Sequence, residues 1–216
     1  MHHFDPFKSS YAGPTWPKVP EKSSVHCKRS LARRNAIRFR KVNPSRPIHT
    51  IFVAIGANLP GHASRPPLET CLWAAGALDS LPGVHVEQVS RWYRSAPIGD
   101  SGKAAIPQPD YVNGVARLCA DTTPEALLAG CQAIEAQAGR VRGERNAPRT
   151  LDLDIIAFGD WVRNSPDPIL PHPRAHLRAF VLLPLADVAP FWVHPVLGQT
   201  VGEIMAGLRD QEIGLI

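Results

Sequence analysis

Residues 151–155 alternate aspartate with leucine or isoleucine, and this alternation constrains how the segment can fold. Successive side chains of a β-strand point to opposite faces, so Asp152 and Asp154 would share one face and the apolar residues the other. Two neighbouring carboxylates on a largely buried strand repel each other and are costly to remove from water. A cation is therefore expected beside them. Mg²⁺ is the natural candidate because it binds one or two carboxylates together with substrate phosphates.

A group of arginines lies just before the aspartate pair: Arg140, Arg142, Arg145 and Arg149. Arginine keeps its charge at any working pH, and its planar guanidinium fits phosphate oxygens. Considered alone, these arginines would be explained better by surface ion pairs with nearby glutamates, which are common and weak. Next to two carboxylates they instead favour a site that binds a metal ion and a polyphosphate.

The chain has no glycine-rich loop of the kinds that bind phosphates. Neither G-x-x-x-x-G-K-[ST] nor G-x-G-x-x-G occurs in it, and the GDSGK sequence at residues 99–103 has the wrong spacing. Phosphate binding would therefore depend on side chains and metal. His172 lies between two prolines that stiffen its loop, and an imidazole can donate a hydrogen bond to phosphate, so it is a candidate contact.

Charge is divided unevenly along the 216 residues. Residues 1–48 hold 11 Lys and Arg against 2 Asp and Glu, whereas residues 49–216 hold 13 against 17. We therefore expect a basic, proline-rich, disordered extension at 1–48 and a mildly acidic catalytic domain at 49–216. The extension has three interpretations: a dispensable segment, a basic arm that contacts nucleic acid or an acidic partner, and an organelle transit peptide, which its prolines disfavour.

Composition favours a cytoplasmic protein for the body of the chain. No apolar run approaches the roughly 18 residues of a membrane-spanning helix, and no secretory signal is expected. The four cysteines (Cys27, Cys71, Cys119 and Cys131) are scattered and form no C-x-x-C pair. Reduced thiols are therefore expected, rather than disulfides or a zinc site.

Apolar spacing predicts alternating strands and helices. Strands are expected at residues 50–55, 84–93, 111–119 and 152–158, and helices at residues 68–81, 123–139, 174–188 and 201–208. The second helix has the clearest start, with Thr123 as its cap, Pro124 at the first position and Glu125 in the first turn. This order predicts an α+β fold, a ferredoxin-like split βαβ sandwich with helices packed on an antiparallel-rich sheet.

Several short motifs follow one another along residues 52–190. They are AIGANL at 54–59, YRSAPIG at 93–99, QPDYVN at 108–113, IE at 134–135, GRVR at 139–142, PRTLDLD at 148–154, PHPR at 171–174 and RAF at 178–180. Ordered motifs at matching intervals are a far more specific signal than any one of them. In these motifs the chain resembles the 6-hydroxymethyl-7,8-dihydropterin pyrophosphokinases of folate biosynthesis, and the resemblance excludes residues 1–48.

The resemblance implies a reaction and a set of roles. The pyrophosphoryl unit of ATP would pass to the hydroxymethyl oxygen of the pterin with release of AMP, and two Mg²⁺ ions held by Asp152 and Asp154 would bridge the phosphates and the attacking hydroxyl. The resemblance assigns catalysis to Arg140, Arg149, Asp152 and Asp154, and ATP binding to Gln132, Arg142, Arg145, His172 and Arg178. It assigns pterin binding to Ser95, Ala96, Ile98, Tyr111, Asn113, Glu135 and Phe180.

Within this set, Tyr111 and Phe180 would sandwich the flat pterin ring, and Asn113 would hydrogen-bond its edge. Without the resemblance, Phe180 would be taken for a core aromatic. The resemblance implies ATP and the pterin as substrates, and we further expect a monomer with no nucleic acid or membrane as partner.

Two departures from the family pattern concern loops. Asn146 occupies the place where bacterial members often have a tryptophan that covers the pterin, and the loop at 142–149 is about one residue shorter. The loop at 95–109 is longer. Closure over the substrates is expected to differ as a result, because such lids exclude water and complete the site.

Two other functions would use parts of the same pattern. A metal-dependent phosphodiesterase or nuclease could use Asp152, Asp154 and His172 with the basic extension as a nucleic-acid arm, but the acidic body disfavours a nucleic-acid channel. A non-catalytic scaffold whose arginines bind acidic partners would leave the carboxylate pair without a purpose.

Overall fold

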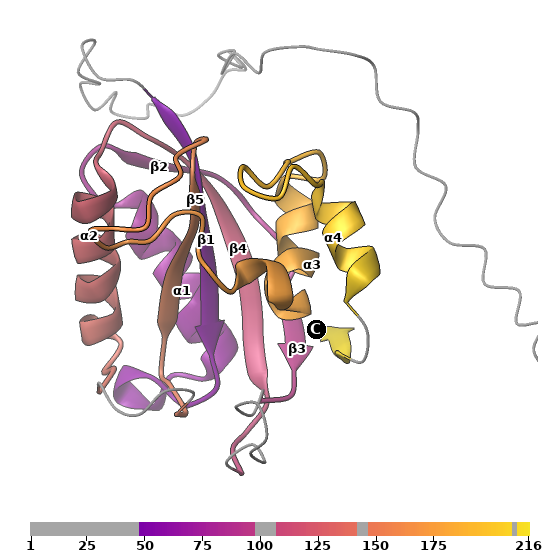
Figure 1. The fold of residues 1–216 in the computed structure, drawn as a ribbon. Coiled ribbons are helices and arrows are strands. Elements are labelled where there is room, and N and C mark those ends of the chain that lie inside the picture. The colour runs from indigo at the N-terminus through magenta and orange to yellow at the C-terminus, as the bar shows by residue number, and fades with distance from the viewer. Residues whose placement is uncertain (1–47, 98–106, 142–146, 209–210) are drawn as a thin grey trace, which may run out of the picture. The chain divides into compact units, whose positions relative to one another are not determined.

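The computed structural model describes residues 48–97, 107–141, 147–208 and 211–216, all within one compact unit of the chain. They form a six-stranded antiparallel sheet with helices on both faces (Figure 1). The expected α+β architecture is confirmed. The extension at 1–48 lies outside the described residues except for Ile48, so its character stays a prediction.

The sheet has the strand order β5-β1-β4-β3-β6, and β2 also pairs with β4. Every described pair is antiparallel. The strands are β1 (His49–Ala57), β2 (Val84–Val89), β3 (Tyr93–Ser95), β4 (Tyr111–Ala120), β5 (Asp152–Phe158) and β6 (Ile213–Leu215). With β2 and β3 taken as two parts of one strand, this is the split βαβ topology expected from the sequence.

The strand predicted at residues 84–93 was wrong in one respect, because it is broken between β2 and β3. At the break, the Ser90 hydroxyl accepts a hydrogen bond from Val115 N at 2.9 Å, and Ser90 N donates to Val115 O at 2.9 Å. The serine side chain therefore replaces one bond of the ladder while the two short strands pair with successive parts of β4.

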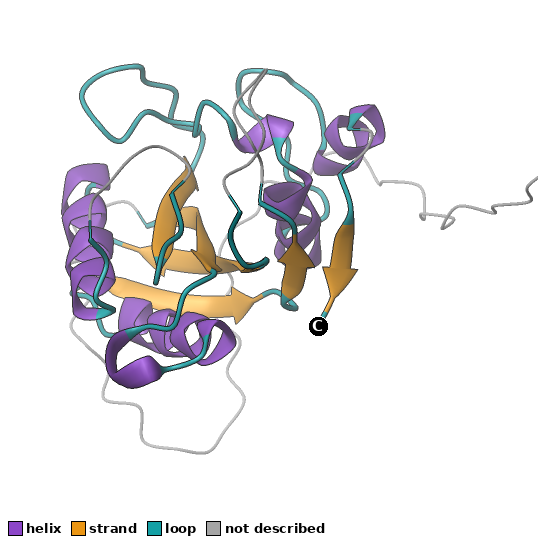
Figure 2. Cartoon of the chain, turned by 90° about the horizontal axis from the view of Figure 1, so that it is seen from below, coloured by secondary structure: helices purple, strands orange, loops and turns teal. Residues whose placement is uncertain are grey.

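One face of the sheet is covered by α1 (Pro67–Asp79) and α2 (Pro124–Gln137), as Figure 2 shows. The predicted start of α2 is confirmed: the Thr123 hydroxyl accepts from Ala126 N at 3.2 Å, and a proline follows it. Buried side chains of both helices, among them Leu78 and Leu127, pack with strand residues such as Ile55 in one apolar core. This burial is the main force holding the two helices on the sheet.

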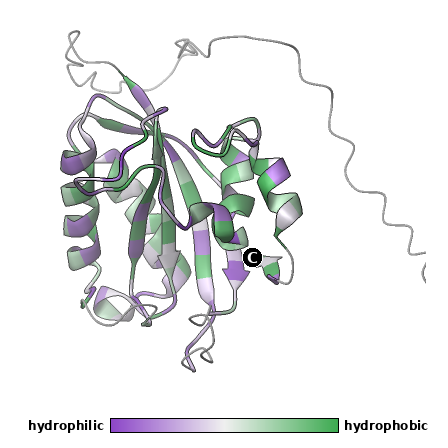
Figure 3. Ribbon diagram, in the orientation of Figure 1, coloured by the Kyte–Doolittle hydropathy of each residue, from purple (hydrophilic) through white to green (hydrophobic). Residues whose placement is uncertain are grey.

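The other face is covered by α3 (Ala179–Val188) and α4 (Val201–Gly207). The single helix predicted at 174–188 was wrong, because a 3-10 turn (Ala175–Leu177) precedes α3 and Arg178 between them is extended, with φ −126° and ψ 107°. Helix α3 is almost wholly apolar and is drawn as hydrophobic in Figure 3. It builds a second core with Val115 and Ile156.

The two cores test the predicted alternation of β5. Leu153 and Ile155 belong to the core under α1 and α2, whereas Ile156 belongs to the core under α3 and α4. Asp152 and Asp154 line a cavity on the latter face, so the prediction that they share one face is confirmed. Within the described ranges, none of the helices has the length and apolar character needed to cross a membrane.

Candidate active site

The register of three strands places the aspartates beside small residues. Asp152 of β5 lies opposite Gly56 of β1, and Gly56 lies opposite Asn113 of β4. One step along, Asp154 pairs with Ala54. The central strand therefore presents almost no side chain between the carboxylates and the amide, which leaves room for a cavity on the sheet.

A cavity of about 740 Å³ occupies this space. It is lined by ten of the predicted site residues: Ser95, Ala96, Tyr111, Asn113, Arg140, Arg149, Asp152, Asp154, Arg178 and Phe180. They come from β3 and the residue after it, from β4 and β5, from the segment between α2 and β5, and from the start of α3. The sequence therefore identified residues that the fold brings together from positions up to 85 apart in the chain.

A second cavity of about 350 Å³ adjoins the first. It is lined by Gln132 and Glu135 of α2 and shares Arg140, Arg149, Asp152 and Asp154 with the larger cavity. The shared residues are those predicted to carry catalysis. The site thus has two compartments that meet at the aspartate pair.

Four of the predicted site residues are not among the described residues that line the two cavities. His172 does not line either cavity, but its Nε2 lies 3.8 Å from Asp154 Oδ2. Ile98, Arg142 and Arg145 lie outside the described residues, as does Asn146 with its predicted effect on closure.

Asp152 is held by two arginines. Its Oδ1 accepts from Arg140 Nη1 at 2.6 Å, and its Oδ2 accepts from Arg149 Nη1. Charge-assisted bonds of this kind are roughly twice as strong as neutral ones, so they fix the carboxylate and both guanidinium groups. Arg149 is fixed again through its backbone, because its N–H donates to Asn58 Oδ1 at 2.7 Å.

Asp154 has a different environment although it lies only two residues away. Its only ion-pair partner among the described residues is His172, and its side chain keeps 37% relative exposure, directed into the cavities. Removal from water, and then the negative charge of Asp152, raise the pKa of Asp154. Burial likewise lowers the pKa of His172, so the imidazole is disposed to be neutral.

The carboxylates can accommodate a divalent cation. Asp154 is a partly desolvated anion without an arginine partner in the described part of the chain, which is the situation that a hard cation relieves. No group of three or more His, Cys, Asp or Glu side chains suitable for a metal occurs among the described residues. Two carboxylates suit Mg²⁺, which commonly takes the remaining ligands from phosphates and water.

Glu135 lies on α2 and is hydrogen-bonded to both β5 and Arg140. Its Oε1 accepts from Leu153 N at 2.8 Å and from Arg140 Nη1. Burial raises the pKa of Glu135, whereas the bond from Leu153 N and the charge of Arg140 oppose that rise. It lines only the smaller cavity, so the structure separates Glu135 from Tyr111, Asn113 and Phe180, with which it was grouped as a pterin contact.

The larger cavity has a polar edge built by β3 and β4. Asn113 Nδ2 donates to the Ser95 hydroxyl at 3.0 Å, which fixes the orientation of a nearly buried amide. The Tyr111 hydroxyl lies 3.2 Å from both Gln108 Oε1 and Ala147 O. Burial is the main cause that raises the pKa of Tyr111, so its phenol stays protonated and can donate.

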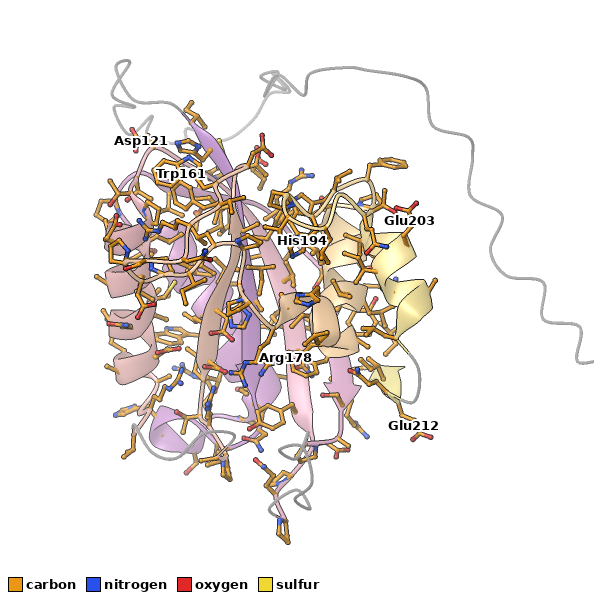
Figure 4. The ribbon with its side chains drawn as sticks, in the orientation of Figure 1. Asp121, Trp161, Arg178, His194, Glu203 and Glu212 are labelled. Carbon is orange, nitrogen blue, oxygen red and sulfur yellow. The ribbon has the colours of Figure 1, made fainter. Side chains whose placement is uncertain are left out.

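On the α3 side, Arg178 and Phe180 form a pair. The Arg178 guanidinium carbon lies 5.4 Å from the centre of the Phe180 ring. Burial, followed by the neighbouring Arg174, lowers the pKa of Arg178. An anion in the cavity would relieve this crowding of positive charge. Figure 4 shows Arg178 near the end of the sheet at which β1 and β3 terminate.

The sequence matches the family described as 7,8-dihydro-6-hydroxymethylpterin-pyrophosphokinase (HPPK) over residues 52–190. A relative from Synechocystis sp., named 2-amino-4-hydroxy-6-hydroxymethyldihydropteridine pyrophosphokinase, is 40% identical over 157 residues, or 73% of this chain and 75% of the relative. A relative of the same name from Pseudomonas aeruginosa is 43% identical over 143 residues, or 66% of this chain and 82% of the relative. The chain belongs to the HPPK family.

Solved structures of longer chains share the HPPK fold. The HPPK-DHPS of Plasmodium falciparum with pterin and p-hydroxybenzoate aligns with a TM-score of 0.56 and 12% identity, over 77% of this chain and 44% of that one. The wild-type protein with STZ-DHP gives 0.57 and 13%. This chain spans less than half the length of those chains, and at such low identity the likeness shows the fold alone.

Sequence reasoning gave no role to Asn58, although it lies in one of the HPPK motifs. This side chain is 2% exposed, and its Nδ2 donates to Gln108 Oε1 at 2.9 Å and to Pro109 O at 3.0 Å. Its Oδ1 accepts from Arg149 N. Asn58 thereby joins the segment before Tyr111 to the segment before the aspartates. A buried polar residue directly after an apolar strand is the signal that could have identified it.

Arg174 and Gln211 were also missed as lining residues of the larger cavity. Arg174 could have been found from its place in the PHPR motif. Gln211 lies in a short polar stretch beyond the HPPK match, and no local pattern in the sequence identifies it.

Proposed function

We propose that this chain transfers the pyrophosphoryl unit of ATP to 6-hydroxymethyl-7,8-dihydropterin, giving AMP and the pterin diphosphate in folate biosynthesis. As a member of the HPPK family it is a diphosphokinase. The observation that supports the particular site is that two cavities meet at one aspartate pair flanked by arginines. Two substrates bound in them would react where Asp152, Asp154, Arg140 and Arg149 converge. The family match gives no support to a phosphodiesterase or nuclease activity.

The pterin would occupy the larger cavity. Tyr111 and Phe180 offer aromatic faces to a flat heterocycle, and stacking of this type contributes on the order of 1 kcal/mol beyond simple burial. Asn113 and the backbone at Ser95 and Ala96 would bond the polar edge of the ring. The flat floor at Gly56 supports this placement, because a larger side chain there would project into the same space.

ATP would occupy the smaller cavity with its phosphates directed toward the larger one. Gln132 and the apolar Leu128 of α2 line the smaller cavity and suit the base and ribose. We now place Glu135 on this nucleotide side, since it lines this cavity and orients Arg140. The phosphates would then lie between Arg140, Arg149 and Arg178.

We further propose that Asp152 and Asp154 hold two Mg²⁺ ions together with the ATP phosphates. Bound there, Mg²⁺ would supply charge neutralisation for the phosphates and lower the pKa of the attacking hydroxyl. The chain itself positions the phosphates through Arg140 and Arg149, whose guanidinium groups are already fixed by Asp152. Donors fixed before the reaction stabilise charge that develops in the transition state without a cost of reorientation.

His172 and Arg178 would act on the transferred group. A neutral imidazole near Asp154 can donate one hydrogen bond to a phosphate oxygen, and Arg178 adds a charge that remains at any working pH. We propose that a monomer is sufficient for turnover, because Arg140, Arg149, Asp152 and Asp154 of the same chain converge where the two cavities meet. We also propose that it acts in the cytoplasm, where its buried Cys71 and Cys131 would remain thiols.

The proposal is tested by analysing the nucleotide product of the full-length chain. We expect AMP, and not ADP, to form from ATP only when the reduced pterin alcohol and Mg²⁺ are both present. Omission of either one, or substitution of EDTA for Mg²⁺, should abolish AMP. Formation of ADP, or of AMP without the pterin, would contradict the proposed reaction.

A further inference from the structure

The wall of the larger cavity includes a residue from beyond the HPPK match. The match ends at residue 190, yet Gln211 lines the cavity together with Leu177, Arg178 and Phe180. Gln211 lies more than 30 residues after these neighbours, so its presence there requires the chain to return to the site after α4.

The backbone around Arg178 is held only in part by hydrogen bonds within its own segment. Helix α3 begins at Ala179, and neither α3 nor the preceding 3-10 turn has a side-chain cap from its flanking residue. The first N–H groups of a helix have no acceptor inside that helix. Arg178 itself is bonded locally, because its N–H donates to Ala175 O and its O accepts from Val181 N and Leu182 N. The N–H of Ala179, the first residue of α3, still needs an acceptor from outside the helix.

Gln211 supplies hydrogen bonds on both sides of Arg178. Its Oε1 accepts from Ala179 N at 2.9 Å, and its Nε2 donates to Leu177 O at 3.0 Å. One side-chain amide thus engages the backbone groups that flank Arg178. The extended conformation of Arg178 between two helical segments is thereby fixed.

The segment that carries Gln211 is itself anchored to another part of the cavity wall. Strand β6 follows Gln211 and pairs with β3, with Ile213 opposite Ser95. Ser95 lines the cavity and holds the Asn113 amide. This C-terminal strand is the last strand of the sheet on the β3 side, as Figure 2 shows. The C-terminal segment therefore connects the polar edge of the cavity with the start of α3.

We propose that Gln211 is a positioning residue of this enzyme, which holds Arg178 and Phe180 in the cavity wall through the backbone that bears them. It acts on the substrate only through these side chains. The inference rests on the proposed function where it names the pterin as the occupant of the cavity. Its structural part, the fixing of the start of α3, stands on the hydrogen bonds alone.

The first test measures pterin binding by titration calorimetry, with a non-hydrolysable ATP analogue and Mg²⁺ present. Gln211→Ala should weaken binding of 6-hydroxymethyl-7,8-dihydropterin about ten-fold, since it removes two backbone hydrogen bonds. Gln211→Glu keeps the acceptor for Ala179 N and should lose less. The matched control is Glu212→Ala, whose exposed side chain points outward (Figure 4) and which should bind like the wild type. Unchanged binding by Gln211→Ala would overturn the proposal.

The second test asks whether Gln211 acts through Phe180. In a double-mutant cycle, Gln211→Ala in a Phe180→Ala background should change pterin binding less than two-fold, because residues that act as a unit are not additive. Full additivity would instead indicate direct contact between Gln211 and the pterin and would overturn the positioning role. A lower melting temperature with unaltered binding would do the same.

The third test needs no substrate. Amide hydrogen exchange in residues 175–182 should be faster in Gln211→Ala than in the wild type, while exchange in β1 and β4 stays the same. Equal exchange at 175–182 would refute the positioning role even if the proposed reaction is correct. Conversely, failure of the wild type to form AMP would refute the proposed reaction and leave the exchange result to decide the role of Gln211.

Discussion

Asp152 and Asp154 show how two identical residues on one face of one strand acquire different properties. Asp152 has a guanidinium group on each oxygen, whereas the only ion-pair partner of Asp154 in the described part of the chain is a histidine at 3.8 Å. A carboxylate whose charge is balanced by cationic neighbours stabilises the folded site. A carboxylate without such neighbours destabilises it until a ligand or a cation binds. Proteins retain such unfavourable groups mainly at functional sites.

This difference leads to opposite expectations for activity and stability. Asp154→Asn should abolish turnover, because metal ligation contributes several kcal/mol to the transition state. The same substitution should leave the melting temperature equal or higher, since it removes a partly desolvated charge beside Asp152. Turnover is measured as AMP release and stability by thermal unfolding without ligands.

The control for this prediction is Asp160→Asn, an exposed carboxylate just after β5. It should keep turnover within a factor of two of the wild type. Retention of more than about a tenth of the wild-type rate by Asp154→Asn would be incompatible with a metal-binding role for this residue.

At the level of elements, the sequence predicted those that local patterns determine. The period of two in β4 and β5 was sufficient to group Tyr111 with Asn113 and Asp152 with Asp154. The cap at Thr123 was sufficient to start α2. These signals are local because strand alternation and helix capping depend on residues within a few positions of each other.

The elements that were missed depend on distant partners. The break at Ser90 exists because a side chain bonds to β4, and the break at Arg178 is held by Gln211. Strand β6 has three residues, two of them exposed, so it lacks an apolar pattern, and its pairing with β3 defines it. The place of Glu135 under β5 likewise follows from a bond to Leu153 N, which no spacing in the sequence reveals.

The loop between α3 and α4 contains a buried histidine that should make stability depend on pH. His194 is 4% exposed, and its Nδ1 accepts from Val196 N and Leu197 N, both at 3.3 Å. Burial, and then the nearby His176, lower the pKa of His194. Below the unfolded-state pKa of about 6.5, the unfolded chain binds a proton that the folded loop resists, so stability is lost as the pH falls.

His194→Asn should reduce this dependence. The asparagine oxygen takes the position of Nδ1 and can accept the same two backbone bonds, but it does not titrate. We therefore expect the loss of unfolding free energy between pH 7.5 and pH 5.5, measured by urea denaturation, to be smaller in the variant. The values at pH 7.5 serve as the reference for any change in packing. An equal loss in both proteins would contradict the assignment.

At the level of the whole molecule, the chain combines a basic N-terminal segment with a mildly acidic catalytic part. The described residues of both cavities lie between positions 54 and 211, and the HPPK match begins at residue 52. Every step of the proposed reaction can therefore be assigned without residues 1–48. The extension has a strong charge but no assigned role in catalysis.

Deletion of residues 1–45 tests this division while leaving β1 intact. We expect kcat and both KM values to stay within a factor of two of the full-length chain, because none of the described cavity residues is removed. The measurement is AMP formation at saturating and at limiting pterin, in low and in physiological salt. A basic arm that attracts the anionic nucleotide would show itself as a rise in the KM for ATP on deletion, greatest at low salt because salt screens exposed charges. Collapse of kcat at every salt concentration would instead mean that the extension belongs to the catalytic domain.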